Sequence, residues 1–469
     1  MKRTVEVNES ILRVWFEGCK DVKIMNRKWC ADTTTTTILL VYCQHVIDHT
    51  KLKQAIAPEM CNDLLQSSFK DSNLLASNSQ FSVTTLELEN SNENVSRMLF
   101  EGKLLIIFQE YKRGYTIDIA KLPTRSIEQS NTEMTIRGSR DGFVEELSTN
   151  IGLIRKRLKT SSLSYDEFII GERTQTKVGL LYLKDVASQE TISQVQFKLK
   201  EINIDGVVSS AQIEEFITGD QFSLFPLIEY TGRPDYAVNC LLHGRFILLV
   251  DGSPTATIAP VSFPFFVNTA EDQNYFYLFG SFVRLLSLFG IAISIFLPGF
   301  WVALVTYHPD QIPYTLLATL SLSREGIPFP APLEGMIMIT LFELLRQAAI
   351  SSGFVSPSMV VMIAISVVST FTLVNQSFTG TLSILRYGVF LMSSFLGIVG
   401  FICSILLIVI HVANLRSFGL PFLAPYSPPV FSSMLPSTFR IPFTRMKKRP
   451  KELHTYDNTR QRTNNDENK

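Results

Sequence analysis

Five charged residues stand in a part of the chain that is otherwise almost free of charge: Arg324, Glu325, Glu334, Glu343 and Arg346. Glu343 and Arg346 are three positions apart, so on a helix they share a face and can pair. Each unpaired charge would cost on the order of 3 kcal/mol or more in the middle of a membrane, so these side chains must face protein or water. The pattern predicts a polar path through an apolar helical domain.

The segment that carries the first three of these charges, SREGIPFPAPLE, also contains three prolines. Proline removes a backbone donor and fixes φ, so IPFPAP cannot continue a helix. Non-helical backbone is tolerated at membrane depth only where protein or a water-filled cavity satisfies it. Residues 308–332 are therefore predicted to form either an external loop or a re-entrant turn that lines a polar path. The short apolar run YTLLATLSL (314–322) favours re-entry.

The domain around these charges is predicted to be helical and to cross a membrane. Uncharged apolar stretches long enough to span a bilayer lie at 285–307, 354–374 and 388–413. Three spans would put the chain ends on opposite sides, yet the N-terminal half shows no export signal and the C-terminal tail is basic, which places both in the cytoplasm. A fourth crossing is therefore expected at 331–349. The alternative is an amphipathic helix that lies flat at the membrane interface.

The N-terminal half is predicted to be an α+β soluble half made of two small mixed α/β modules. β-rich runs with intervening helices indicate the first module, and strand-like runs alternating with amphipathic helices indicate the second. The expected organisation is an N-terminal α+β module at 1–120, a connector at 121–137, a second α/β module at 138–268, a juxtamembrane segment at 269–284, a transmembrane domain at 285–413 and a basic cytoplasmic tail at 414–469.

Two local patterns in this half predict individual elements. LLIIF (104–108) and YTIDI (115–119) flank a turn that contains KRG, which predicts a β-hairpin. A helix is expected to begin after Ser139, which can cap it, and to end near Leu158 with a buried apolar face. Arg155 falls in the basic last turn of that helix, where positive charge complements the helix dipole.

No residue constellation in the chain indicates an enzyme. The motifs GxGxxG, GxxxxGK[ST], HExxH and GxSxG do not occur in the soluble half. His45 and His49 have i, i+4 spacing, but the preceding segment is strand-like and no third ligand is evident, so no metal is expected. The six cysteines form no CxxC pair and are expected to be reduced. With 43 basic and 43 acidic side chains, the charge balance does not indicate nucleic acid as a partner, and no cofactor is predicted.

Small residues in the last predicted span indicate close helix packing, because they let another helix approach. They fall on one stripe of a continuous helix and are Ser393, Gly397, Gly400 and Ser404. In the span 354–374, Ser366, Ser369 and Thr370 give a modestly polar face. That face can line a pore, but packing is the favoured interpretation.

Four ordered stretches carry a resemblance to a known family. They are PTRSIEQSNTEMTIRGSRDGFVEELSTNIGLIRKRL (123–158), RPDYAVNCLLHGRFILLVDGSPTATIAPVSF (233–263), LPGFWVALVTYHPDQIPYTLLATLSLSREGIPFPAPLEGMIM (297–338) and RSFGLPFLAPYSP (416–428). Together they resemble the A subunits of bacterial spore-germination nutrient receptors, the GerA family. The resemblance covers residues from about 120 to 450, and SREGIPFPAPLE is its most specific part.

The resemblance implies a subunit of a receptor complex in the spore inner membrane, where it works with a permease-like B subunit and a lipoprotein C subunit. It also implies that the A subunits form homo-oligomers and a nutrient-gated channel, whose opening releases monovalent cations early in germination. The polar path expected from the charges agrees with that role, although the two arguments are independent.

The sequence departs from the family pattern inside the apolar domain. After LFELLRQAA the family continues with a long Gly-rich apolar stretch before a Ser-Pro pair, whereas here only ISSGFV precedes Ser356 and Pro357. A family transmembrane element is therefore expected to be missing, which affects the count of crossings.

Two other classes of function remain open. A secondary transporter would be expected to show inverted repeats of broken helices, and no such repeat is visible. A membrane-anchored signalling or scaffold protein would use its soluble half to bind a partner and would not need the charges of Glu334, Glu343 and Arg346.

Removing the charge at Glu343 or Arg346 is expected to impair nutrient-triggered ion release from spores without removing the protein from membranes, because the remaining charge loses its partner. Ion release after nutrient addition, together with immunoblots of the membrane fraction, measures both outcomes for Glu343→Ala and Arg346→Ala. Unchanged release kinetics in both variants would remove these residues from the predicted path.

Overall fold

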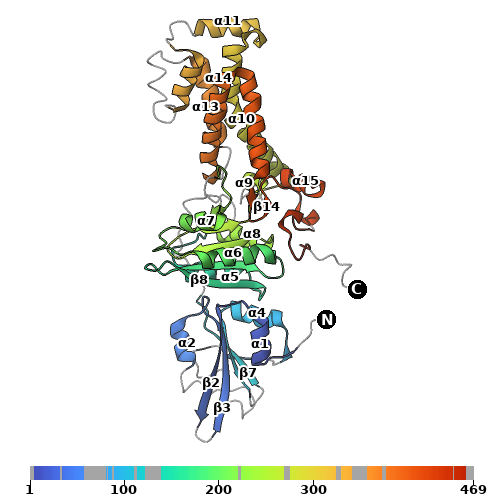
Figure 1. The fold of residues 1–469 in the computed structure, drawn as a ribbon. Coiled ribbons are helices and arrows are strands. Elements are labelled where there is room, and N and C mark those ends of the chain that lie inside the picture. Colours follow the sequence, from blue (N-terminus) through green and yellow to red (C-terminus); the bar gives the residue numbers. More distant parts are fainter. Residues whose placement is uncertain are drawn as a thin grey trace. The chain divides into compact units, whose positions relative to one another are not determined.

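The computed structural model describes most of the chain (Figure 1). The described residues are 5–31, 34–56, 81, 83–86, 89–109, 113–121, 139–219, 223–268, 275–323, 329–340, 356–371, 376–446 and 448–460. Backbone contacts divide the chain into two compact units. Unit 1 comprises Met1–Gly219, Tyr230–Ala259 and Leu453–Asn458, and unit 2 comprises Asp220–Glu229, Pro260–Glu452 and Thr459–Lys469.

The first part of unit 1 is a five-stranded antiparallel sheet with helices on both faces. Its strand order is β2-β3-β6-β7-β4. The strands are β2 (Val22–Ala31), β3 (Thr34–Cys43), β4 (Val83–Leu86), β6 (Lys103–Phe108) and β7 (Arg113–Asp118). One face packs against α1 (Glu9–Trp15) and α4 (Asn92–Phe100), and the other packs against α2 (His49–Ala55). A separate ladder pairs β1 (Val5–Glu6) with β5 (Glu89–Asn90).

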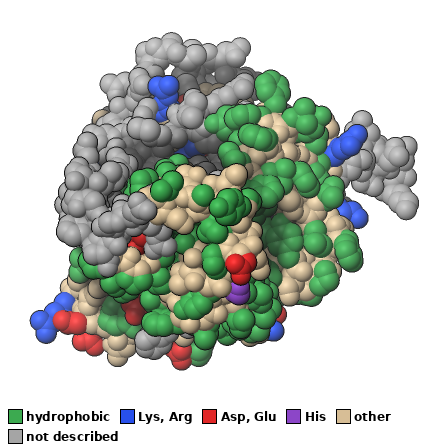
Figure 2. Space-filling model, turned by 90° about the horizontal axis from the view of Figure 1, so that it is seen from above, with side chains coloured by type: hydrophobic (Ala, Val, Ile, Leu, Met, Phe, Trp, Pro, Cys, Tyr) green, Lys and Arg blue, Asp and Glu red, His purple; other side chains and the backbone are tan. Residues whose placement is uncertain are grey.

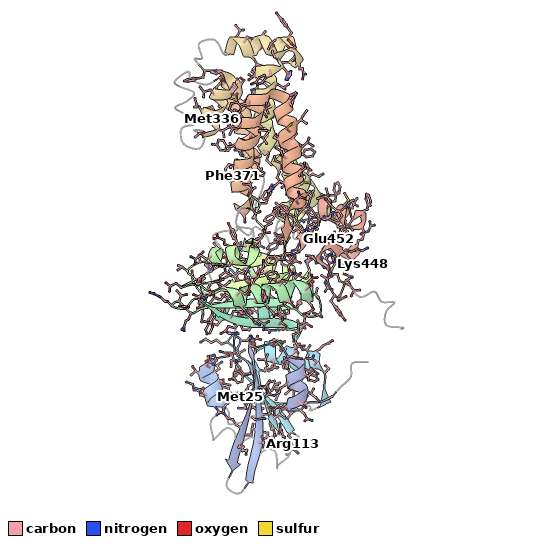
Figure 3. All side chains as sticks on the ribbon, viewed as in Figure 1. Met25, Arg113, Met336, Phe371, Lys448 and Glu452 are labelled. Carbon is pink, nitrogen blue, oxygen red and sulfur yellow. The ribbon has the colours of Figure 1, made fainter. Side chains whose placement is uncertain are left out.

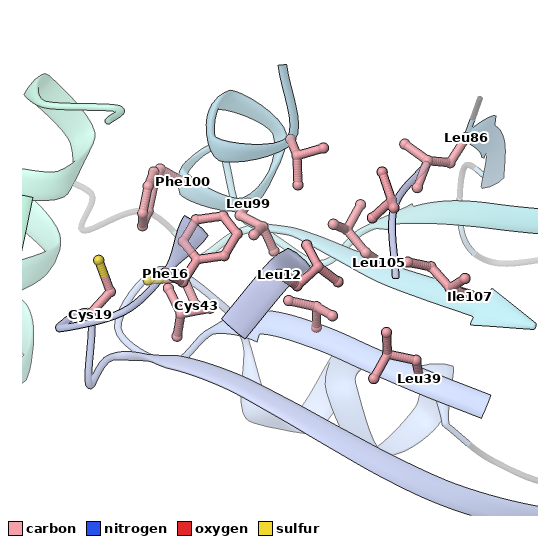
Figure 4. Packing of buried hydrophobic residues seen from close by; sticks show 14 of the residues in the cluster. Leu12, Phe16, Cys19, Leu39, Cys43, Leu86, Leu99, Phe100, Leu105 and Ile107 are labelled. Atoms are coloured by element: carbon pink, nitrogen blue, oxygen red, sulfur yellow. The ribbon is translucent and has the colours of Figure 1, made fainter. Parts of the chain in front are cut away.

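Successive side chains of β3 and β6 point to opposite faces and build two apolar cores. The face toward α1 and α4 takes Leu39, Val41, Leu105 and Ile107 (Figure 4). The face toward α2 takes Ile38, Leu40, Leu104 and Ile106. Because helices cover both faces, these strands are apolar at nearly every position instead of alternating with polar residues. β6 and β7 form the hairpin that the sequence predicts, with Lys103 opposite Asp118 and Phe108 opposite Arg113.

The second part of unit 1 is another five-stranded sheet, in the order β10-β12-β11-β9-β8. Its strands are β8 (Leu163–Ile170), β9 (Thr176–Leu183), β10 (Glu229–Thr231), β11 (Phe246–Val250) and β12 (Ala256–Ala259). Its helices are α5 (Leu147–Arg157), α6 (Gln189–Glu201), α7 (Ser210–Thr218) and α8 (Pro234–Leu242). β11 pairs antiparallel with β9 and β12, and β8 pairs antiparallel with β9. The alternation of strands and helices along the chain therefore does not build a parallel sheet.

α5 begins later than the sequence predicts because a distant residue caps it. The helix starts at Leu147 and not after Ser139, and Asp251 Oδ1 accepts a hydrogen bond from Leu147 N at 3.0 Å. The Asn150 side chain accepts from Val144 N at 2.8 Å and donates to Val144 O at 2.5 Å. These bonds hold the preceding residues in a non-helical turn, so the prediction that Ser139 caps this helix is wrong.

A buried ion pair joins the two parts of unit 1. Arg155 donates from Nε to Asp21 Oδ2 at 2.7 Å and from Nη2 to Asp21 Oδ1 at 2.8 Å, and both side chains are 0% exposed. Its other N–H groups donate to the carbonyl oxygens of Thr160 and Leu163, and the Phe100 ring centre lies 4.3 Å from the guanidinium carbon. The two sheets are therefore held together by a bidentate contact that is fully removed from water.

The pair sets the protonation of the groups around it. Burial raises the pKa of Asp21, but the charge and hydrogen bonds of Arg155 outweigh burial, so that pKa lies below its usual value. Cys43 donates its thiol to Asp21 at 3.4 Å, and its pKa is raised well above the usual value, chiefly by burial. Cys43 is therefore a packed thiol and not a reactive one.

Unit 2 is mainly helical, which confirms the prediction of an α+β half followed by a helical region. Its helices are α9 (Phe263–Val267), α10 (Tyr277–Tyr307), the 3-10 turn η2 (Pro309–Gln311), α11 (Tyr314–Ser323), Ala331–Thr340, α13 (Pro357–Thr370) and α14 (Gln376–Asn414). Among the described residues, Tyr277–Tyr307 and Ser377–Asn414 are long and apolar enough to cross a membrane, whereas Ala331–Thr340 and Pro357–Thr370 are apolar but shorter. Hydrophobic side chains are spread over much of the described surface of the face shown in Figure 2.

α14 consists of two helices that lie antiparallel. Gly397 has φ 62° and ψ −139°, which is outside the helical region and open to glycine. The Phe225 ring lies 5.9 Å from Phe378, near the start of α14, and 5.9 Å from His411, near its end. A straight helix would separate those two residues by about 50 Å, so the chain turns back at Gly397.

The helix expected at 388–413 is therefore interrupted at Gly397, and its crossing of a membrane stays a prediction. Residues 376–396 form a first arm of α14, and residues 398–414 form a second arm that returns beside it. Apolar residues continue through the turn, so hydropathy does not mark it. The segment predicted as the span 354–374 also differs, because α13 has 14 residues between its cap Ser356 and Phe371 and is about 21 Å long.

The predicted boundaries of unit 2 shift at both ends. α10 begins at Tyr277, inside the expected juxtamembrane segment 269–284. The expected basic tail contains the ladder of β13 (Arg416–Ser417) with β14 (Leu420–Pro421), α15 (Phe431–Thr438), and the 3-10 turns η3 (Phe443–Arg445) and η4 (Lys451–Leu453). Leu453–Asn458 belongs to unit 1, where Tyr456 N donates to Val186 O at 3.0 Å. The described part of the tail is thus folded.

Asp21→Asn is expected to lower the free energy of unfolding of unit 1 by about 3 kcal/mol or more, because the buried guanidinium of Arg155 loses its counter-charge. Hydrogen exchange of the α5 amides in the detergent-solubilised full chain measures this. Since the pKa of Asp21 is lowered on folding, the stabilisation is fully present above the unfolded value of about 3.9 and is lost as the pH falls through the folded value. The difference between wild type and variant is therefore expected to shrink only in that acidic range.

Asp205→Asn is the matched control, since Asp205 pairs with Arg173 at 2.7 Å but the two side chains are 71% and 83% exposed. Its effect is expected to stay below about 1 kcal/mol. Similar exchange rates in the two variants would contradict a special role for the buried pair.

Candidate functional site

α13 and α10 run in opposite directions and meet at two levels. Ser366, late in α13, donates its hydroxyl to Ser294 O of α10 at 2.7 Å. Met359, early in α13, packs in one apolar cluster with Val302, which lies further along α10. The first arm of α14 contributes to both levels, and these three segments enclose the buried polar residues of unit 2.

A proline in α10 creates the acceptor at the first level. Proline has no N–H, so Pro298 cannot complete the intrahelical hydrogen bond to Ser294 O. That carbonyl accepts instead from Ser366 Oγ at 2.7 Å and from Arg386 Nε of the first arm at 2.9 Å. The carbonyl oxygen of Ser294, which has no hydrogen-bond donor within α10, therefore accepts hydrogen bonds from the two helices that pack against α10.

Arg386 is the centre of this polar layer. Its side chain is buried, and Nη2 donates to Ser294 Oγ at 2.8 Å and to Thr370 Oγ1 at 2.5 Å. The two hydroxyl oxygens are 2.8 Å apart. A guanidinium directs its donors in a fixed plane, so α10, α13 and the first arm must keep one mutual rotation to satisfy it.

Glu334 forms a second buried charged site at the opposite end of α13. The residue lies in the helix Ala331–Thr340 and is 0% exposed. Its Oε1 accepts from Ser356 N and from Ser356 Oγ, both at 2.5 Å. Ser356 is also the N-cap of α13 and accepts from Met359 N at 3.4 Å. The carboxylate therefore lies at the positive end of the α13 dipole.

α13 is held between a carboxylate at its N-terminus and a guanidinium at its C-terminal end, and each charge is opposite in sign to the end of the helix dipole that it faces. Between them lies an apolar cluster formed by Val302, Ala331, Met338, Ile339, Met359, Ile363 and Phe390. Figure 3 labels Met336 on the helix Ala331–Thr340 and Phe371 at the end of α13, which mark the two levels. A short helix with polar contacts at its ends and an apolar middle can shift as a rigid body when one end is released.

The structure describes one of the five residues predicted for the polar path, Glu334. Arg324, Glu325, Glu343 and Arg346 lie outside the described residues, so the Glu343–Arg346 pair stays a prediction.

The four small residues predicted to pack helices do not share one continuous stripe, because Gly397 forms the turn of α14. Ser393 is on the first arm and faces α10, since a Cβ added to Gly299 would lie 2.9 Å from Ser393 Oγ. Gly400 and Ser404 are on the second arm. Close approach is thus present at Ser393, while a role of all four in helix packing stays a prediction.

Sequence reasoning missed Arg386 and Ser294. The predicted span started at residue 388, which left Arg386 outside it, and Ser294 is an ordinary residue of the span 285–307. The useful signal was Pro298 inside that span, because an intrahelical proline always leaves the carbonyl four residues earlier without its N–H partner. Ser366 and Thr370 were recognised as a polar face but not connected to a charge.

His45 and His49 do not lie on one helical face. His45 is in a turn after β3, with its ring centre 5.7 Å from that of Tyr165, whereas His49 begins α2. Burial lowers the pKa of His45, which favours a neutral imidazole packed against an aromatic ring.

Comparisons with known proteins give one consistent result. The sequence model of the family described as Bacillus/Clostridium GerA spore germination protein matches residues 10–351 and 347–452. Spore germination protein XA of Bacillus anthracis is 95% identical over 492 residues, with 100% of both chains covered. Uncharacterized membrane protein YfkQ of Bacillus subtilis (strain 168) is 33% identical over 392 residues, which cover 79% of this chain and 76% of the relative.

A solved structure, the N-terminal domain of the A subunit of the Bacillus megaterium spore germinant receptor GerK3, is 23% identical with a TM-score of 0.41. It covers 56% of this chain and 97% of that domain.

The family match is interrupted near the place where the sequence predicts a missing element. The two matched stretches meet at residues 347–351. The alignment with the Bacillus anthracis protein extends over 492 residues, whereas this chain has 469. That relative therefore contains residues with no counterpart here, and the loss of a whole transmembrane element stays a prediction.

Thr370→Val is expected to destabilise unit 2 by about 1–3 kcal/mol, because it keeps the side-chain shape but removes an acceptor for Arg386 and a partner for Ser294. The thermal unfolding midpoint of the full chain in nanodiscs measures the effect. Thr319→Val is the control: Thr319 is exposed on α11, and its hydroxyl donates only within that helix, to Thr315 O. Equal midpoints for the two variants would show that the polar layer is not needed for stability.

Proposed function

The chain belongs to the GerA family of Bacillus/Clostridium spore germination proteins, and on that premise we propose that it is the A subunit of a nutrient-responsive germination receptor. In this proposal it resides in the spore inner membrane with a permease-like B subunit and a lipoprotein C subunit. Copies of the chain assemble and provide the nutrient-gated, ion-conducting part.

The observation that supports the proposal is the pair of buried charges at the ends of α13. Arg386 is the single Asp, Glu, Lys or Arg residue of α14, and Glu334 is fully buried in another, apolar helix. Ionised groups within a membrane domain cost on the order of 3 kcal/mol or more, so they persist where they serve a pathway or a switch. Both charges contact the same short helix, which makes α13 the element that a gating signal would move.

Electrostatics suggests how such a gate works. In the described state α13 turns Ser366 and Thr370 toward Arg386, and an apolar cluster fills the space between the two charged ends. A guanidinium beside a path opposes the passage of cations. Opening therefore requires α13 to move so that Glu334 and hydroxyl oxygens, not Arg386, border the water. A nutrient signal can drive this movement of α13 only if it stabilises the open state more than the described state.

The helix directions suggest a topology with an even number of crossings. α10 and the first arm of α14 run one way, while α13 and the second arm run the other way. The soluble half and the basic C-terminal segment then lie on the same side, as the positive-inside rule requires for a cytoplasmic location. In this proposal the turn at Gly397 provides the fourth crossing, as an alternative to the crossing expected at 331–349, of which residues 341–349 lie outside the described residues.

Glu334→Gln is expected to slow nutrient-triggered release of monovalent cations by about tenfold, which corresponds to about 1.4 kcal/mol, because in the open state proposed above the carboxylate borders the water and its negative charge favours cations there. Glutamine keeps the size and one acceptor oxygen, so the protein is expected to remain in membranes at normal levels. Time-resolved cation release from spores after nutrient addition measures the change.

Asp310→Asn is the matched control, because Asp310 is an exposed carboxylate in η2 of the same unit. Its release kinetics are expected to equal those of the wild type. If Glu334→Gln also released cations at the normal rate, the gate would not depend on this charge, and a scaffold function for the chain would be favoured.

A further inference from the structure

α15 presents a large apolar face to its surroundings. Phe431 is 81% exposed and Leu435 is 64% exposed, and they are four residues apart, so they lie on the same side of the helix. Phe439, just after the helix, is also exposed. Large apolar side chains grouped on one exposed side indicate contact with something other than water.

A basic run follows this apolar side directly. Residues 440–451 contain Arg440, Arg445, Lys447, Lys448, Arg449 and Lys451 and no acidic residue. Arg445, Lys448 and Lys451 are exposed. Lys448 is labelled in Figure 3 together with Glu452, the first acidic residue after the run.

α15 is attached to the start of α10 by hydrogen bonds. Arg284 Nη1 donates to Pro436 O at 3.2 Å, and Arg440 N donates to Ser281 Oγ at 3.1 Å. These contacts lie immediately before the uncharged stretch 285–307 of α10. The first turns of α10 also expose aromatic side chains, with Phe276 at 82% and Phe282 at 60%. The apolar side of α15 therefore lies close to exposed aromatic side chains at the start of α10, which together resemble an interfacial aromatic belt.

We propose that residues 431–451, here called the interfacial segment, bind the surface of a bilayer rich in anionic phospholipid. Phe431 and Leu435 enter the boundary between headgroups and acyl chains, and the basic side chains contact the phosphates. The position beside the start of α10 favours a lipid surface, because a helix that enters the bilayer there brings α15 to the headgroup layer. The positive charge selects anionic over zwitterionic headgroups. This proposal does not depend on the proposed channel function.

The test uses the full chain with Phe431→Trp in nanodiscs of phosphatidylcholine alone or mixed with phosphatidylglycerol. Phospholipids brominated near the headgroup end of the acyl chains quench an indole that reaches that depth. Wild-type protein in the same discs gives the background from Trp15, Trp29 and Trp301. Quenching of the added indole is expected to be at least about twofold stronger in the anionic discs and to weaken at high salt. Equal quenching in both lipids, or none, overturns the proposal.

Charge reversal tests the role of the basic run. In the Phe431→Trp protein, the combined changes Arg445→Glu, Lys448→Glu and Lys451→Glu are expected to abolish the difference between the two lipids. The same charge change on exposed lysines of unit 1 is the control, made as Lys28→Glu, Lys51→Glu and Lys200→Glu. An equal loss in the control overturns specific headgroup binding by the interfacial segment.

Two further variants keep the test decisive. If the Phe431→Trp protein does not fold, Leu435→Trp repeats the test, because Leu435 lies on the same side of α15. Val208→Trp, at a position 85% exposed in unit 1, gives the quenching of an indole in water. Quenching at position 435 that equals the value at position 208 contradicts the proposal.

Discussion

A guanidinium buried among apolar helices has to find oxygen acceptors inside the protein, and Arg386 finds them on two neighbouring helices. The backbone acceptor exists because Pro298 cannot bond to Ser294 O, and the hydroxyls of Ser294 and Thr370 also accept from Arg386. The arrangement of unit 2 depends on this requirement. Rotation of any one of the three segments would remove an acceptor from a charge that cannot reach water, whereas the apolar contacts alone would tolerate several rotations.

Unit 1 uses an arginine for a related purpose but with a different partner. Arg155 is also removed from solvent, yet its partner is a carboxylate, and carbonyl groups and an aromatic ring complete its surroundings. The carboxylate of Asp21 neutralises the charge of Arg155, and this bidentate contact holds the two sheets of unit 1 together. The acceptors that the structure shows for Arg386 are hydroxyl and carbonyl oxygens of low charge.

The elements that the sequence could predict are those decided by local pattern. The β6–β7 hairpin and the apolar composition of α10 follow from side chains that are neighbours in the chain. The start of α5 could not be predicted, because Asp251 caps it from another part of the sequence. Arg155 illustrates the same limit: its place in a basic last turn is compatible with a solvated charge, and only the fold shows that Asp21 buries it. The polar layer of unit 2 could be predicted only in part. Pro298, Ser366 and Arg386 each interrupt an apolar stretch of the sequence, but they are far apart in it, so their contact could not be predicted.

In the proposed membrane arrangement, the turn at Gly397 affects how the chain is integrated during its synthesis. An arginine near the middle of an isolated helix opposes insertion by about 2.5–3.5 kcal/mol, whereas each Leu, Ile, Phe or Val favours it by about 0.3–0.6 kcal/mol. The second arm contains no Asp, Glu, Lys or Arg and is rich in those four residues. Because the tight turn delivers both arms to the translocon together, the second arm offsets the unfavourable transfer of the first. α10 and α13 have by then already left the ribosome, so the hydroxyls that receive Arg386 are available when it enters the lipid.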